Sequence, residues 1–161
     1  MVKMYETFFE DGKKFLKTAR GGLKRPSVFT EEILYNILLM SMEKNIMGIL
    51  IYHGDMADNH TVTDLLDALE RVIQMDKKVI ADLLEFERYQ TICSVFDGYQ
   101  RKKMTFEVIH RMIETATIIE NHALAVCASR RSPDPVKSED KGEQFQGRNH
   151  GSVVPVRISV M

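Results

Sequence analysis

Apolar residues recur at steps of three and four along most of the first 128 residues, which is the period of an amphipathic helix. This spacing predicts a first helix over residues 2–20, followed by Gly21-Gly22 as a stop signal. The predicted apolar side of this helix carries Met4, Phe8, Phe15 and Leu16. The first element is therefore expected to pack one face against the rest of the chain.

The next predicted helix differs because it is apolar on almost every side from residue 33 to residue 52. Thr30 precedes it as a good N-cap, and the acids of Glu31-Glu32 suit the positive end of the helix dipole. A helix without a polar face belongs at the centre of a bundle. Charged residues interrupt the run at Glu43 and Lys44, so we expect a buried core helix and no membrane span.

Three further helices follow from the same period. One is capped by Thr63, or by Thr61 with Asp64 three residues later, and one covers roughly residues 77–95. The last long helix begins at Thr105. No stretch before residue 129 combines β-branched alternation with hairpin turn chemistry, so the sequence predicts an all-α, up-and-down bundle of four to five helices.

The composition changes after residue 128. Prolines, glycines and charges dominate residues 129–152, and a stretch with so few apolar side chains buries too little surface to offset its ordering entropy. We therefore predict a helical-bundle domain over 1–128 and a flexible, low-complexity tail over 129–161.

Charge adds a second level of organisation. The 161 residues carry a formal net charge of -1, which argues against electrostatic capture of nucleic acid by the whole chain. Residues 1–25 nevertheless have a local net charge of +4, and residues 54–91 have one of -5. The first residues contain acids and no apolar signal core, so we expect a cytoplasmic protein.

Catalytic and cofactor motifs are missing from the sequence. It has no Gly-rich phosphate loop, no CxxC pair and no HExxH, and its one Glu-x-x-His pair has no second copy to complete a di-iron site. We expect no cofactor and no metal. Glu43 and Lys44 lie in the most apolar helix, and His60 follows a polar turn; these three are the candidate ligand-binding residues.

The segment 34–69 resembles the HEPN superfamily (higher eukaryotes and prokaryotes nucleotide-binding). The features that carry the resemblance are a central Glu-Lys pair in an apolar helix, a Gly-containing turn, a His, and a helix with an "Asp-Leu-Leu" start. In this chain they are Glu43-Lys44, Gly54, His60, and Asp64-Leu65-Leu66 with Leu69. The resemblance implies a four- or five-helix bundle that forms a homodimer and binds a nucleotide or a protein partner such as a small nucleotidyltransferase.

Many HEPN proteins are metal-independent ribonucleases with an Arg-x(4–6)-His motif on a late helix. No Arg in this sequence has a His five to seven residues after it; Arg101 and His110 are nine apart, and Arg111 and His122 are eleven apart. These four residues are the candidates for a divergent ribonuclease, in which Arg would stabilise phosphate and His would transfer protons.

The leading hypothesis is a non-catalytic HEPN-like protein that binds a nucleotide or a partner protein. The alternatives are a divergent metal-independent ribonuclease and a structural or regulatory interaction module. Basic residues that would face phosphates are Lys13, Lys14, Lys17, Arg20, Arg101, Lys102 and Lys103.

Overall fold

The computed structural model describes residues 3–89 and 103–129, which form five helices and no strand. The helices are α1 (Met4–Gly22), α2 (Glu31–His53), α3 (Val62–Val72), α4 (Lys77–Glu87) and α5 (Phe106–Ser129). At 1.5 Å per residue, α1, α2 and α5 are each about 30 Å long or slightly longer, whereas α3 and α4 are about half that length. The predicted all-α bundle of four to five helices is confirmed.

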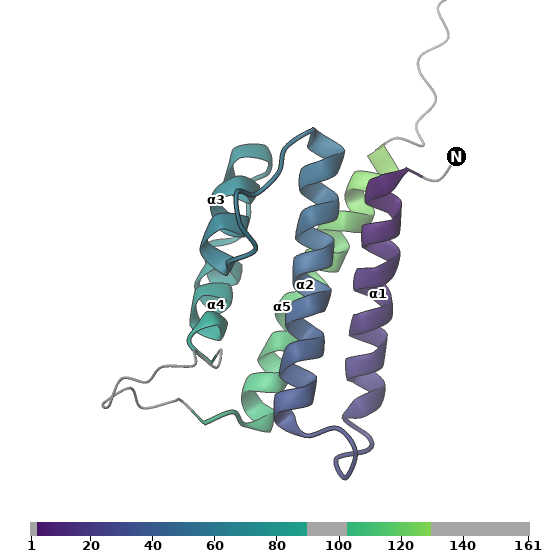
Figure 1. Ribbon diagram of the computed structural model, residues 1–161, viewed down its shortest axis with the longest axis vertical. Helices are drawn as coiled ribbons and strands as arrows, with labels where there is room; N and C mark the ends of the chain where they lie inside the picture. The colour runs from purple at the N-terminus through teal and green to yellow at the C-terminus, as the bar shows by residue number, and fades with distance from the viewer. Residues whose placement is uncertain (1–2, 90–102, 130–161) are drawn as a thin grey trace, which may run out of the picture.

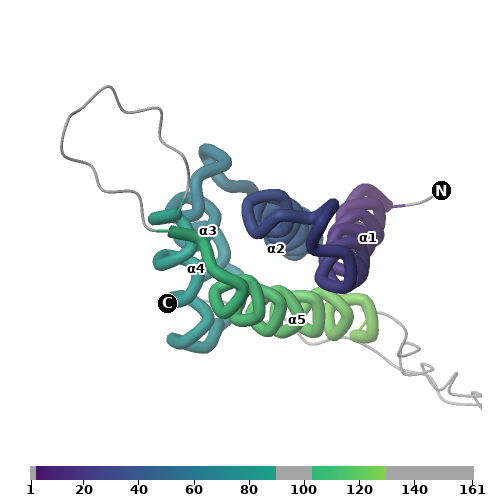
Figure 2. Tube along the Cα trace, turned by 90° about the horizontal axis from the view of Figure 1, so that it is seen from below, coloured from purple at the N-terminus to yellow at the C-terminus, as the bar shows by residue number. Residues whose placement is uncertain are grey.

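The three long helices form the frame of the bundle (Figure 1). α1 and α2 run antiparallel side by side, and α5 packs across both of them, as the view along the bundle shows (Figure 2). α3 and α4 lie on the other side of α2, where α3 packs against α2 and α4 packs against α5, and neither packs against α1. The two short helices therefore take the place of one long helix in a simple up-and-down bundle.

The centre of the fold is α2, as its apolar composition predicted. Leu38 and Met42 are fully buried, and an unbroken buried run extends from Asn45 to Leu50. By length and composition α2 also meets the criteria for a membrane span, but 61% of its most apolar window is buried among the other helices. Packing inside the bundle accounts for its apolar character.

The buried face of α1 differs from the predicted one. Met4 is 62% exposed, and Phe8 and Phe15 are only partly buried. The residues that face the core are Tyr5, Phe9, Gly12, Leu16, Ala19 and Gly22. Small residues lie in this face because α1 approaches α2 closely, and the helix continues through Gly21-Gly22 instead of stopping at residue 20.

The helix caps follow local chemistry. The Thr30 hydroxyl accepts a hydrogen bond from the backbone N–H of Ile33, and Thr61 rather than Thr63 caps α3 by accepting one from the N–H of Asp64. α2 ends at His53 and is capped by Gly54, whose φ of 76° is in the left-handed region.

Two helix boundaries differ from the predicted ones. The helix predicted over 77–95 ends at Glu87 in the structure, and residues 90–95 lie outside the described residues. α5 extends to Ser129, one residue beyond the predicted domain boundary. The predicted tail lies outside the described residues from residue 130 onward.

Candidate functional site

Glu43 and His60, which are seventeen residues apart in the sequence, meet in the structure. His60 Nδ1 lies 2.8 Å from Glu43 Oε1, so the turn before α3 is tied to the middle of α2. The adjoining crevice has a volume of about 40 Å³, far below the roughly 300 Å³ at which pockets for small organic ligands begin. The pair is therefore a polar contact between elements, with space for little more than water beside it.

Lys44 does not join this pair. Successive residues of a helix point about 100° apart, and Lys44 therefore turns toward α1. Its Nζ lies 4.9 Å from the centre of the Phe8 ring, a cation–π contact. The three predicted ligand-binding residues thus divide between two sides of α2.

Arg111 is held by two carboxylates of α4. Its Nη2 lies 2.6 Å from Asp82 Oδ1 and 2.9 Å from Glu85 Oε2. Asp82 is only 6% exposed, and it also accepts hydrogen bonds from Lys78 and Thr115. This network joins α4 to α5, and the guanidinium at its centre is occupied by protein groups.

The charges in this network stabilise one another. Burial opposes ionisation of Asp82, but the hydrogen bonds from Arg111 and Lys78 outweigh it and hold the pKa of Asp82 below its ordinary value. Hydrogen bonds to Glu85 and Asp82 raise the pKa of Arg111. Sequence reasoning missed Asp82; the available signal was an acid inside an apolar helical run, four residues after Lys78.

The described ribonuclease candidates do not form a catalytic pair within one chain. Arg111 and His122 are eleven residues apart on α5, which separates them by about 16 Å along the helix axis. His110 is exposed, and as the neighbour of Arg111 it points in a different direction. Arg101 lies outside the described residues.

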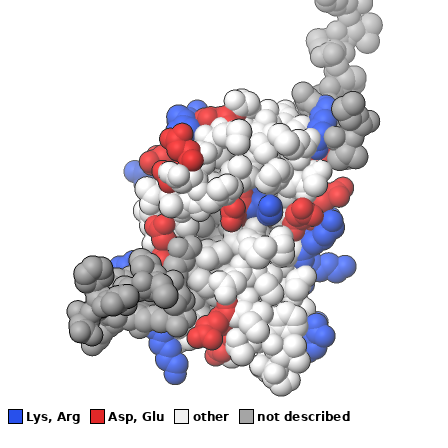
Figure 3. All heavy atoms as spheres, in the orientation of Figure 1, with Lys and Arg blue, Asp and Glu red and all other residues white. Residues whose placement is uncertain are grey.

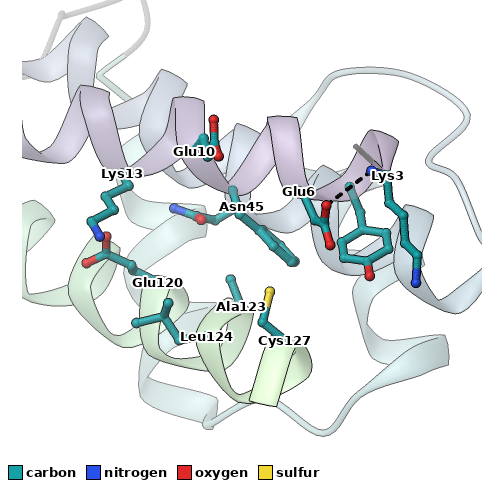
Figure 4. Close-up of a pocket in the computed structure, with 11 residues that line it drawn as sticks. Lys3, Glu6, Glu10, Lys13, Asn45, Glu120, Ala123, Leu124 and Cys127 are labelled. Carbon is teal, nitrogen blue, oxygen red and sulfur yellow. Dashed lines mark hydrogen bonds between the residues drawn. The ribbon is translucent and has the colours of Figure 1, made fainter. Parts of the chain in front are cut away.

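A larger cavity lies between α1 and the C-terminal half of α5 (Figure 4). This α1–α5 cavity has a volume of about 520 Å³, within the range of small-molecule sites. It is lined by Lys3, Tyr5, Glu6, Phe9, Glu10, Lys13, Asn45, Glu120, Ala123, Leu124 and Cys127. Sequence reasoning missed it because its two walls are more than 100 residues apart in the chain.

Two side chains that line the cavity, Asn45 and Phe9, are held in position by close contacts between α1 and α2. Asn45 of α2 lies against Gly12 of α1, where an added Cβ would come within 2.6 Å of the amide nitrogen. Phe9 of α1 lies against Gly48 of α2, where an added Cβ would come within 2.4 Å of a ring carbon. Each helix thus supplies a glycine notch for a side chain of the other.

The polar groups of the cavity include both acceptors, the carboxylates of Glu6, Glu10 and Glu120, and donors, the ammonium groups of Lys3 and Lys13. Glu6 already accepts a hydrogen bond from the backbone N–H of Lys3, while Lys13 and Glu120 point toward each other from opposite walls (Figure 4). Burial raises the pKa of Tyr5, so its hydroxyl keeps its proton at neutral pH.

Basic side chains continue away from the cavity along α1. Lys13, Lys17 and Arg20 follow each other at steps of four and three residues, which places them on one helix face. Figure 3 shows blue side chains along the edge of the molecule where α1 lies, with acids among them. Arg20 also donates a hydrogen bond to Thr117 of α5 at 2.7 Å, so this face borders the junction of the two helices.

The other predicted phosphate-facing residues are placed differently. Lys14 lies on the next face of α1 and pairs with Asp11 at 3.2 Å. Lys103 is exposed beside a hollow that it shares with Glu31 and Glu32 at the start of α2. Lys102 lies outside the described residues. Among the described residues, no three His, Cys, Asp or Glu side chains gather as metal ligands would.

Comparison with known proteins identifies the fold. The structure matches the crystal structure of an archaeal HEPN homologue with a TM-score of 0.56 and 15% sequence identity, over 77% of this chain and 98% of that one. No protein-family model and no curated protein matches the chain. The bundle is therefore HEPN-like in its fold, as the resemblance of segment 34–69 implied.

Proposed function

We propose that this chain is a non-catalytic, HEPN-like helical-bundle protein that binds a nucleotide in the α1–α5 cavity. The observation that carries the proposal is a cavity of about 520 Å³ that combines aromatic residues, hydrogen-bonding groups and, at one end, the cation of Lys13. Pockets of this size that are partly apolar and hold a few polar groups are typical of small-molecule sites. The HEPN-like fold adds support, because the sequence resemblance that implied it also implies nucleotide binding.

The lining offers a partner for each part of a mononucleotide. Tyr5 and Phe9, which are 8% and 9% exposed, offer a small aromatic surface to a base, and the carboxylates of Glu10 and Glu120 are acceptors for ribose hydroxyls. Lys13 supplies a cation for the phosphate, and the basic face continues from it to Lys17.

The state of Arg111 favours binding over RNA cleavage. A guanidinium that stabilises a reacting phosphate must be free to meet it, and this one is engaged by Asp82 and Glu85. We therefore expect no cleavage of labelled RNA in the presence of a chelator. Cleavage that disappears in His110→Ala or His122→Ala would contradict the non-catalytic part of the proposal.

Calorimetric titration of AMP into the full chain tests the binding. We expect a saturable heat, and we expect Lys13→Gln to weaken binding roughly tenfold, because a charge-assisted hydrogen bond to phosphate is lost. Lys14→Gln is the matched control: it removes the same charge one residue away, outside the cavity lining, and leaves the affinity unchanged. The absence of saturable heat at millimolar AMP would refute the proposal.

A further inference from the structure

The acids and bases along one side of α1 lie in two separate stretches. Glu6 and Glu10 line the α1–α5 cavity, and Lys13 follows them as the last residue of α1 in the cavity lining (Figure 4). Lys17 and Arg20 continue the same side of the helix at steps of four and three residues. The three bases form the basic face of α1, which begins at the cavity and leads away from it.

The outer two cations of the basic face have no carboxylate partner. Lys17 and Arg20 are exposed, and neither forms an ion pair with an acid in the described part of the chain. The contact that Arg20 makes is with a neutral group, the hydroxyl of Thr117, at 2.7 Å. Like charges three and four residues apart repel each other and destabilise a helix, and an anion bound along the basic face would remove this repulsion.

The spacing of the basic face suits a chain of phosphates. Lys13 and Lys17 are separated by about 6 Å along the helix axis, and Arg20 lies about 4.5 Å further. A triphosphate chain is similar in length to one helical turn of about 5.4 Å. When its first phosphate meets Lys13, its last phosphate therefore comes within reach of Lys17. The contact with Thr117 uses one nitrogen of the Arg20 guanidinium, which leaves other N–H donors for the same phosphate.

We infer that the site binds a nucleoside triphosphate in preference to a monophosphate, with the phosphate chain lying along the basic face from Lys13 toward Arg20. This inference rests on the proposed function, because it assigns the phosphate chain of the nucleotide that the cavity would bind. The carboxylates of Glu6 and Glu10 fix the direction of the ligand: they repel phosphate from the inner part of the cavity and leave the side beyond Lys13 for it.

The test is calorimetric titration of AMP, ADP, ATP and inorganic triphosphate into the full chain, with EDTA present so that no Mg²⁺ covers the phosphates. We expect ATP to bind roughly tenfold more tightly than AMP, because its added phosphates accept charge-assisted hydrogen bonds from exposed cations. High salt should reduce this preference, since exposed charges are screened. Inorganic triphosphate should bind more weakly than ATP, because it has no base or ribose to fill the cavity.

Two variants locate the phosphate chain. Lys17→Gln should weaken ATP binding several-fold and leave AMP binding unchanged, because the single phosphate of AMP meets Lys13. Lys14→Gln is the matched control: it removes the same charge from the next face of α1 and should leave the preference for ATP intact. Both lysines are exposed, and a thermal melt checks that each variant folds.

The outcomes separate the inference from the function on which it rests. Equal binding of AMP and ATP to the unmodified chain overturns the role of the basic face and leaves nucleotide binding intact. A preference for ATP that Lys17→Gln and Lys14→Gln reduce equally does the same, because the phosphate chain then lies elsewhere. If inorganic triphosphate binds as tightly as ATP, or if no nucleotide binds, both the proposed function and the inference are overturned.

Discussion

The same substitution, Gly→Ala, is expected to have opposite effects on stability at two positions of the bundle. At Gly48 an added Cβ would lie 2.4 Å and 2.6 Å from two ring carbons of Phe9. Carbon atoms in contact normally lie about 3.5–4.0 Å apart, so the methyl group overlaps the ring by more than 1 Å. At Gly21 the same methyl group meets nothing within 4 Å.

Two opposing effects set the change in the free energy of unfolding at each position. Replacing Gly by Ala inside a helix gains about 1 kcal/mol, because the flexible glycine of the unfolded chain is removed. Overpacking a well-filled contact costs about 1–3 kcal/mol, and the rigid Phe9 ring places Gly48 at the upper end of this range. The net expectation is a loss of about 1–2 kcal/mol for Gly48→Ala. For Gly21→Ala, near the end of α1, we expect a gain of about 0.5 kcal/mol.

Urea unfolding followed by circular dichroism measures the free energy of unfolding of both variants. The slope of this free energy against urea concentration should stay unchanged, which shows that the compactness of the folded and unfolded states is unaffected. Gly48→Ala should also weaken AMP binding, because Phe9 lines the α1–α5 cavity and must move to admit the methyl group. If Gly48→Ala stabilises the protein as much as Gly21→Ala does, the Phe9 ring does not press closely on Gly48, and the reasoning is refuted.

Substitutions of Arg111, Gly54 and Thr61 test three further local features by urea unfolding. Arg111→Gln should cost about 2 kcal/mol at pH 7, less than a fully buried pair because the Arg side chain is 36% exposed. The folded pKa of Asp82 lies below its unfolded value of about 3.9, so the ion pair stabilises above that pH and its contribution is lost as the pH falls further. The gap between the original chain and Arg111→Gln should therefore shrink below pH 4, and an unchanged gap would contradict this assignment. Gly54→Ala should cost about 1 kcal/mol because of its left-handed backbone, and Gly54→Asn less. Thr61→Ala should cost about 1 kcal/mol through loss of the α3 cap, whereas Thr63→Ala leaves that cap in place.

The parts of the fold that could be predicted from the sequence depend on neighbouring residues. A cap such as Thr30 acts on an N–H three residues away, and the apolar run of α2 is sufficient to indicate burial on all sides. The buried face of α1 was harder to predict, because Gly12 and Gly22 have no side chain and so give no apolar signal of their own. They are buried because α2 approaches α1 closely, which only the packed structure reveals.

In the candidate site too, contacts between helices could not be predicted from the sequence. The sequence marked Glu43 and His60 as unusual, and the structure brings them into contact. It did not indicate that Arg111 would meet Asp82, since a charge on a helix can face either solvent or another charge. The place of Asn45 could not be predicted from the sequence either, because its burial depends on how closely α1 packs against α2 at Gly12.

The two glycine notches also limit how the molecule can move. Asn45 is seated at Gly12 and Phe9 at Gly48, so sliding α1 along α2 would drive both side chains out of their notches at once. We therefore expect α1 and α2 to move as a single piece on the microsecond to millisecond timescale of helix shifts. A ligand in the cavity would then be accommodated chiefly by shifts of α5, which lines it with Ala123, Leu124 and Cys127. Slower amide exchange upon ligand binding should accordingly concentrate in the C-terminal half of α5 and leave α2 almost unchanged.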